Sequence, residues 1–92
     1  MRVNQTRDHL GEIGYFVDSN YWGKGIATRA TKLIEKWGFN KLKLKRIEIM
    51  MNPKNKASEK IAIKCGYKKE GLMKKALHDG KEDAYLYAKV RN

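Results

Sequence analysis

The chain has little of what marks secreted, metal-binding or membrane-spanning proteins. Its 92 residues contain one cysteine, Cys65, which excludes a disulfide within the chain, and only His9 and His78 as histidines. These three residues lack the spacing of a zinc site, so we expect no metal. No stretch approaches the ~18 consecutive apolar residues of a membrane span, and no export signal is visible. We therefore expect a cytoplasmic protein without a membrane partner.

Acidic residues are also scarce. Ten Asp and Glu stand against 21 Lys and Arg, a formal charge of +11. Such a charge favours anionic partners, among them nucleic acids and phosphate-bearing ligands. The basic residues are spread along the whole chain, including the run at 41–46, so a small nucleic-acid-binding protein is the less favoured interpretation. Apolar residues at 41% indicate one small folded domain.

The hydrophobic pattern predicts an α/β (α+β) fold with the order strand, helix, strand, helix, strand, strand. After a polar lead, the elements are a strand at 11–18, a helix at 26–40, a connector, a strand at 46–52, a helix at 55–65, and two strands at 67–77 and 81–90. The first strand–helix–strand unit has the size of a parallel crossover. Asp79-Gly80 supplies turn chemistry for a closing antiparallel hairpin. A mixed sheet is therefore expected.

Both helices have an apolar face. In the first helix that face is predicted to hold Ala27, Ala30, Leu33, Ile34 and Trp37. In the second it is predicted to hold Ala57, Ile61 and Cys65, with Ala62 beside them. Asn55 is placed to cap the second helix and Gly66 to end it.

The stretch "NYWGKGIAT", residues 20–28, carries two glycines just before the first helix. The amides of Gly23 to Ala27 are then the unpaired donors of the first turn, which together with the helix dipole suit a phosphate group. Neither a third glycine of GxGxxG nor the Lys-Ser/Thr of a P-loop is present. By itself, the stretch is equally consistent with a tight strand-to-helix turn.

Two separated blocks, 11–39 and 52–71, resemble the GCN5-related N-acetyltransferases (GNAT), in the RimJ/RimL-like branch that acetylates protein N-termini. The family's acetyl-CoA loop reads Arg or Gln, two residues, Gly, one residue, Gly or Ala. Here Trp22 stands at its first position, Gly25 at its first glycine and Ala27 at its last position. In the second block, Asn55 and Ser58 followed by Gly66 are similar to the family's second signature.

The resemblance implies acetyl-CoA as the acetyl donor and an amine, such as a protein N-terminus, as the acceptor. The first strand and the 46–52 strand would lie parallel and splay apart, with Gly14 at a bulge. The implied acetyl-CoA-binding residues are Tyr15, Phe16, Val17, Trp22, Gly23, Lys24, Gly25, Ile26, Ala27, Thr28, Asn55 and Ser58.

The resemblance implies catalysis by direct attack of the amine on the thioester, which needs a base and a proton donor. Ser58 is the candidate donor to the leaving thiolate, or else only a polar residue of the first helical turn. Related enzymes carry a base where Met50 and Leu77 stand here. Glu48 and Glu12 are the nearest carboxylates, and each could instead be an ordinary surface group.

Complete family members are about twice as long, so the resemblance implies a partial GNAT fold, the acetyl-CoA half, with the N-terminal part missing. The strand at 11–17 would then be an open sheet edge, and open edges pair with other chains. We expect a homodimer on this ground. A non-catalytic CoA-binding or dimerisation module stays as the alternative function.

Overall fold

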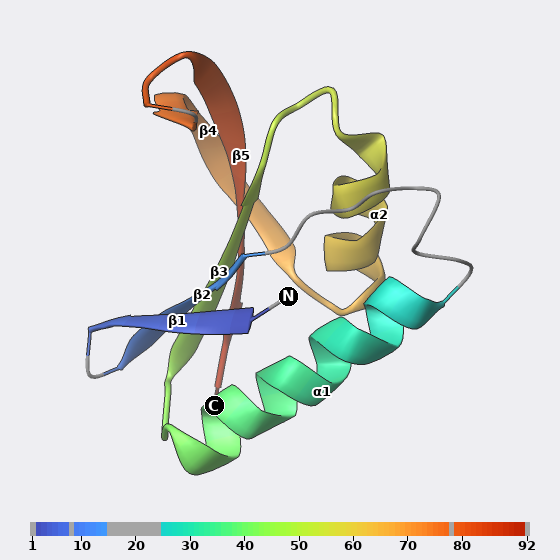
Figure 1. The fold of residues 1–92 in the computed structure, drawn as a ribbon, viewed down its shortest axis with the longest axis vertical. Helices are drawn as coiled ribbons and strands as arrows, with labels where there is room; N and C mark the ends of the chain where they lie inside the picture. The colour runs from blue at the N-terminus through green and yellow to red at the C-terminus, as the bar shows by residue number, and fades with distance from the viewer. Residues whose placement is uncertain (1, 8, 15–24, 78, 92) are drawn as a thin grey trace.

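The computed structural model describes residues 2–7, 9–14, 25–77 and 79–91. They form β1 (Arg2–Arg7), β2 (Leu10–Gly14), α1 (Ile26–Lys41), β3 (Arg46–Met51), α2 (Lys56–Lys64), β4 (Lys68–Leu77) and β5 (Glu82–Val90). Figure 1 shows the sheet with α1 and α2 on the same side of it. None of the helices in these ranges is long and apolar enough to cross a membrane.

The five strands form one mixed sheet in the order β1-β2-β3-β5-β4. β2 and β3 are parallel and are joined by α1, as the crossover prediction required. β5 returns antiparallel to β3, and β4 pairs with the other side of β5. The predicted α/β class, the helix positions and the mixed sheet are confirmed.

The segment that we expected to be a polar lead is a strand. β1 pairs antiparallel with β2, with Val3 opposite Ile13 and Asn4 opposite Glu12. The prediction that the following strand is an open edge was therefore wrong, because β1 covers that edge from residue 10 to residue 14. β1 itself is the outer strand of the described sheet, so the argument for a homodimer from the 11–17 edge does not hold.

β2 and β3 stop pairing with each other before either strand ends. Their parallel pairing runs from Leu10 opposite Arg46 to Glu12 opposite Glu48. β2 continues to Gly14 and β3 to Met51, yet in the described ranges neither continuation is paired with the other strand. The implied splay is thus present, and its mouth lies at the carboxyl ends of both strands.

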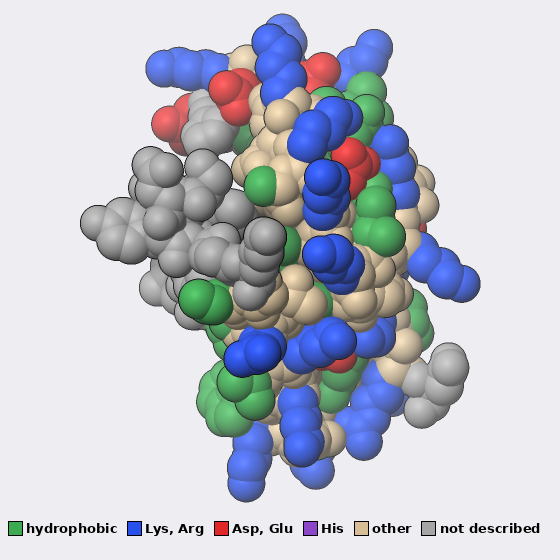
Figure 2. Space-filling model, turned by 90° about the vertical axis from the view of Figure 1, so that its right-hand side faces the viewer, with side chains coloured by type: hydrophobic (Ala, Val, Ile, Leu, Met, Phe, Trp, Pro, Cys, Tyr) green, Lys and Arg blue, Asp and Glu red, His purple; other side chains and the backbone are tan. Residues whose placement is uncertain are grey.

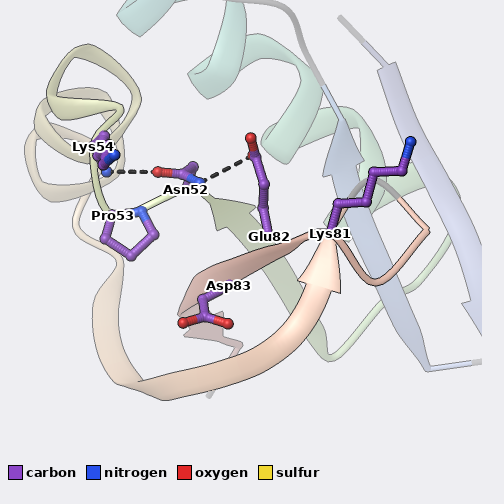
Figure 3. A pocket seen from close by; sticks show the side chains of 6 residues that line it. All are labelled: Asn52, Pro53, Lys54, Lys81, Glu82 and Asp83. Carbon is purple, nitrogen blue, oxygen red and sulfur yellow. Dashed lines mark hydrogen bonds between the residues drawn. The ribbon is translucent and has the colours of Figure 1, made fainter.

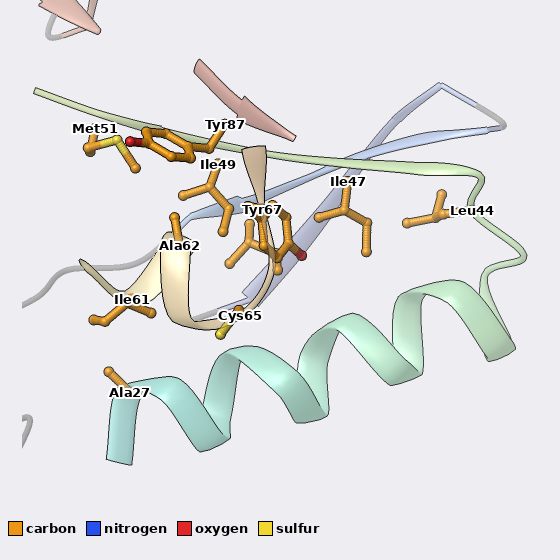
Figure 4. Packing of buried hydrophobic residues seen from close by; sticks show 11 residues of the cluster. Ala27, Leu44, Ile47, Ile49, Met51, Ile61, Ala62, Cys65, Tyr67 and Tyr87 are labelled. Atoms are coloured by element: carbon orange, nitrogen blue, oxygen red, sulfur yellow. The ribbon is translucent and has the colours of Figure 1, made fainter. Parts of the chain in front are cut away.

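The core lies between the sheet and the two helices. Figure 4 shows the side chains of Ile47, Ile49 and Met51 on β3 directed toward the side of Ile61 and Ala62 on α2. The opposite parity of β3, Arg46, Glu48 and Met50, is only partly covered. The connector before β3, which we interpreted mainly as a basic linker, also contributes to the core, since Leu44 is fully buried.

The buried face of α1 differs from the predicted one. Leu33 is 68% exposed and Trp37 50% exposed, whereas Thr31 and Gly38 are buried along with the correctly predicted Ala27. Small residues let the helix approach the sheet closely. Thr31 tolerates burial because its hydroxyl donates a hydrogen bond to the carbonyl oxygen of Ala27 at 2.8 Å.

α2 and the closing hairpin match the predictions in most details. Asn55 and Cys65 are the N-cap and C-cap of α2, and Gly66 follows with a φ of 87°. Ile61, Ala62 and Cys65 are buried as expected, but Ala57 is exposed and Ser58 takes its place in the buried face. In the hairpin, Asp79 and Gly80 both have positive φ, as the turn prediction requires.

Candidate active site

The first turn of α1 begins at a glycine in the left-handed conformation. Gly25 is the N-cap residue with φ 84° and ψ −12°, and as a glycine it has no side chain to cap the helix. The amide of Arg29 donates to the Gly25 carbonyl oxygen at 2.9 Å, so the amides of Ile26, Ala27 and Thr28 precede the helical hydrogen-bond ladder. Among the described residues, a Cβ at Gly25 would meet nothing within 4 Å. Dihedral freedom, rather than space within the protein, is therefore what glycine provides here.

Six of the residues implied in acetyl-CoA binding lie outside the described residues: Tyr15, Phe16, Val17, Trp22, Gly23 and Lys24. Of the others, Ile26 is half exposed and Ala27 is buried. The carbonyl oxygen of Thr28 lies 3.7 Å from the Cys65 sulfur, which places the start of α1 against the end of α2.

The start of α2 is capped by the residue predicted to do so. The Asn55 side-chain oxygen accepts a hydrogen bond from the Ser58 amide at 3.1 Å. The Ser58 side chain faces the sheet and is only 3% exposed. The predicted capping role of Asn55 is thus observed, and it uses the oxygen of the side chain rather than its amide nitrogen. Ser58 is a buried hydroxyl rather than a surface one.

The two carboxylates considered as bases are neighbours. Glu12 and Glu48 are opposite each other at the last pairing between β2 and β3. By strand alternation both lie on the face of the sheet away from the helices, next to the mouth of the splay. Partial burial, and secondarily the negative charge of Glu48, raise the pKa of Glu12.

An arginine distinguishes these carboxylates. The Arg46 Nε atom donates to the Glu48 carboxylate at 3.0 Å, and its two terminal nitrogens donate to the two Glu70 oxygens at 2.9 and 2.6 Å. The bonds to Arg46 lower the pKa of Glu70. Sequence reasoning did not find this triad, because Glu70 reaches Arg46 only through the sheet order. Glu12 is the carboxylate of the cluster that no guanidinium holds in the described structure.

Tyr87 and Cys65 belong to the hydrophobic core, and Tyr85 packs against it. Tyr87 is buried, donates a hydrogen bond to Glu59 at 2.6 Å, and has its pKa raised to about 12 by desolvation and by that carboxylate. The Tyr85 ring lies under the Lys69 ammonium group, 3.4 Å from its centroid. Burial raises the pKa of the Cys65 thiol, which makes it a poor nucleophile.

A pocket of about 480 Å³ opens beyond the carboxyl end of β3. Figure 3 shows its lining of Asn52, Pro53, Lys54, Lys81, Glu82 and Asp83. The Asn52 amide donates to Glu82 at 3.0 Å, and its oxygen accepts from the Lys54 backbone at 2.8 Å. The first bond ties the loop before α2 to the start of β5, and the second lies within that loop. In the part of the chain that the structure describes, no group of three or more His, Cys, Asp or Glu could hold a metal ion.

Comparison with known families identifies this arrangement. The family model described as "Acetyltransferase (GNAT) domain" matches residues 1–68. The chain belongs to the GNAT acetyltransferase family. A curated GNAT relative, the probable N-acetyltransferase YjcK of Bacillus subtilis, is 44% identical over 68% of this chain and 35% of its own length.

Two solved GNAT structures extend the match. The ribosomal-protein-S5-alanine acetyltransferase of Vibrio fischeri is 37% identical with a TM-score of 0.83, over 98% of this chain and 50% of that one. The microcin C7 self-immunity acetyltransferase MccE, solved in complex with acetyl-CoA and AMP, is 36% identical with a TM-score of 0.73, over 89% of this chain and 47% of that one. The GNAT chain described here thus spans about half the length of these structures.

Proposed function

We propose that this chain binds acetyl-CoA at the splay between β2 and β3 and takes part in the N-acetylation of an amine. The observation that carries the proposal is the ending of β2–β3 pairing at Glu12 and Glu48 while both strands continue. Backbone groups released there can bind an extended ligand, as β-augmentation does at a sheet edge. The acetyl-CoA bound in the MccE structure supports the same ligand for this chain.

In this proposal the first turn of α1 holds the pyrophosphate. The amides of Ile26 to Thr28, the positive end of the helix dipole and the left-handed Gly25 favour an anion at this position. Trp22 to Lys24, outside the described residues, belong to the same proposed pyrophosphate loop, whereas Tyr15 to Val17 are proposed to bind the pantetheine arm and the acetyl carbonyl. Asn55 and Ser58, at the start of α2, would meet the pantetheine arm.

We assign the base to Glu12 rather than Glu48. Glu48 is held by Arg46, whereas no guanidinium holds Glu12 in the described structure and its raised pKa makes it a stronger proton acceptor. The amine nitrogen forms a bond to the acetyl carbon, the carbon–sulfur bond breaks, and Glu12 takes the amine proton directly or through water. The Ser58 hydroxyl would donate a proton to the departing thiolate from the helix side of the sheet, and it would regain one from the second proton that the nitrogen releases as the amide forms.

The acceptor is proposed to be a protein N-terminus, in line with the ribosomal-protein acetyltransferase of Vibrio fischeri. We place the reaction in the cytoplasm, where acetyl-CoA and unblocked N-termini are both available. The alternative, a non-catalytic CoA-binding or dimerisation module, shares the donor site and differs in having no turnover.

Homodimerisation also remains a proposal, on a different surface from the one first expected. The outer strand β1 and the exposed Ile26, Leu33 and Trp37 of α1 are the features that favour self-association. Light scattering at micromolar concentration tests it. A monomer with a cooperative melt would contradict it.

Two measurements test the proposed function. Calorimetry should detect acetyl-CoA binding. The absence of binding heat at millimolar acetyl-CoA would contradict the proposed donor site. Thiol release with peptides beginning in Ser or Ala should then exceed the peptide-free rate, and Glu12→Gln should lower it at unchanged acetyl-CoA affinity. Binding without thiol release would favour the non-catalytic alternative.

A further inference from the structure

On the two helices, the basic side chains are exposed and the acidic side chains turn toward the sheet. α1 and α2 together carry seven basic residues and two acidic ones, Glu35 and Glu59. All the basic residues are exposed: Arg29, Lys32, Lys36, Lys41, Lys56, Lys60 and Lys64. Figure 2, which faces the helix side of the molecule, shows lysine and arginine side chains spread down this surface.

Both acidic side chains of the helices turn toward the sheet. Glu35 accepts a hydrogen bond from the Lys89 ammonium group at 3.0 Å, and its side chain is 14% exposed. Glu59 accepts from Tyr87, and its other oxygen lies 3.6 Å from Lys56. Within the described part of the chain, that contact is the only ion pair formed by the seven basic residues. The outward helix surface therefore has almost no compensating negative charge.

The basic residues form one surface rather than two. On α2, Lys56, Lys60 and Lys64 recur every four residues and share a face. On α1, Arg29, Lys32 and Lys36 occupy the outward side. The contact between Cys65 and Thr28 brings the two helices together, so the surfaces join. We call these six residues the basic helix face.

We propose that the basic helix face binds the phosphate backbone of a nucleic acid. α1 has 16 residues and is about 24 Å long, which suits a ligand with charges repeated along its length better than a single phosphate group. Lysines outnumber arginine five to one on this face, and lysine contacts phosphates as a point charge. We therefore expect binding with little base readout.

The arrangement of apolar residues argues against a membrane surface. Interfacial helices insert a continuous apolar face into the lipid. The exposed large hydrophobic residue among the six basic positions is Ile63, while Ile26, Leu33 and Trp37 form a separate stripe on α1 that borders Arg29 and Lys36. In the sequence, Lys and Arg are spread along the whole chain, and nucleic acid was the less favoured partner for that reason. The fold gathers six of them without using the donor site.

Fluorescence anisotropy with labelled RNA and DNA duplexes of about 20 base pairs tests the proposal between about 50 and 200 mM salt. We expect similar affinity for both duplexes and a steep decrease with salt. The triple variant Lys32→Glu, Lys36→Glu, Lys60→Glu should bind at least about tenfold more weakly. Its salt slope should be smaller by about three. If charge reversal unfolds the protein, as circular dichroism would show, the corresponding Lys→Gln triple replaces it.

The matched control is Lys68→Glu, Lys74→Glu, Lys81→Glu, at exposed positions of β4 and the β4–β5 turn. Each triple changes the charge by −6, from +11 to +5, so overall charge is equal in the two proteins. Equal loss of binding in both triples would overturn the proposal, as would absence of RNA and DNA binding at low salt. Sedimentation with anionic phospholipid vesicles that depends on the same lysines, without duplex binding, would assign the face to membranes instead.

Discussion

Glu12 and Glu48 face each other across the parallel strands β2 and β3, at the last position where the two strands are paired. Two carboxylates on one face of a sheet repel each other when both are charged. Arg46 compensates Glu48, whereas partial burial, and secondarily the negative charge of Glu48, raise the pKa of Glu12. In the proposed mechanism, this carboxylate is the proton acceptor for the reacting amine.

The raised pKa of Glu12 predicts a pH dependence of stability. A carboxyl whose folded-state pKa is higher than its unfolded value stabilises the fold at low pH and loses that contribution as pH rises through the folded value. Denaturant titrations from about pH 4 to pH 7 should therefore show that Glu12→Gln gains stability relative to wild type as pH rises. Glu48→Gln should reduce the effect by removing the second charge. Parallel pH curves for wild type and Glu12→Gln would contradict the assignment.

Gly25→Ala should destabilise the protein by about 1–2 kcal/mol, because a side chain is strained at the φ of 84° that starts α1. Gly71→Ala is the matched control, since a Cβ there also meets nothing within 4 Å and no left-handed φ is involved. Urea denaturation measures the difference. Calorimetry should also show weaker CoA binding for Gly25→Ala alone, and unchanged affinity would exclude the first turn of α1 from the site.

Asn55→Ala should cost about 1 kcal/mol, because the Ser58 amide loses its capping oxygen. Asn55→Asp keeps a capping oxygen and should restore most of this stability in the same urea titrations. If Asn55 also donates to the pantetheine arm, the Asp variant will still bind CoA less tightly. Full recovery of both stability and affinity would limit Asn55 to capping.

Leu44→Ala should cost about 3 kcal/mol, since the side chain is fully buried although it belongs to the connector before β3. Leu33→Ala serves as the control and should change the free energy of unfolding by no more than about 0.5 kcal/mol in the monomer. Thermal melts of the two variants give the comparison. Similar melting temperatures would mean that the connector does not pack as described.

The features predicted correctly from sequence are those with local causes. α2 has its cap at Asn55 and its stop at Gly66, and the closing hairpin has Asp79-Gly80, so neighbouring residues specify each boundary. β1 was missed because an outer strand needs no apolar face. Val3 lies among polar residues, and backbone pairing with β2 does the rest.

Errors in the predicted contacts have tertiary causes. The buried face of α1 is centred on small residues that permit close packing. Thr31 can be buried there because its hydroxyl bonds to the Ala27 carbonyl oxygen, which an apolar pattern does not reveal. The candidate bases were named from the sequence, but their adjacency depends on the strand register. Arg46 gives the two carboxylates different surroundings. Its contact with Glu70 depends on the sheet order, in which β4 lies two positions away from β3.

The short pairing between β2 and β3 has a consequence for how the fold comes apart. Only three residue pairs join these strands in the described structure, against six between β3 and β5. We therefore expect the β1–β2 hairpin and the β3–β5–β4 unit to open as two separate units, connected by α1 and this short pairing. Amide exchange should begin where β2 and β3 meet, and a ligand bound there would slow that exchange by holding the two units together.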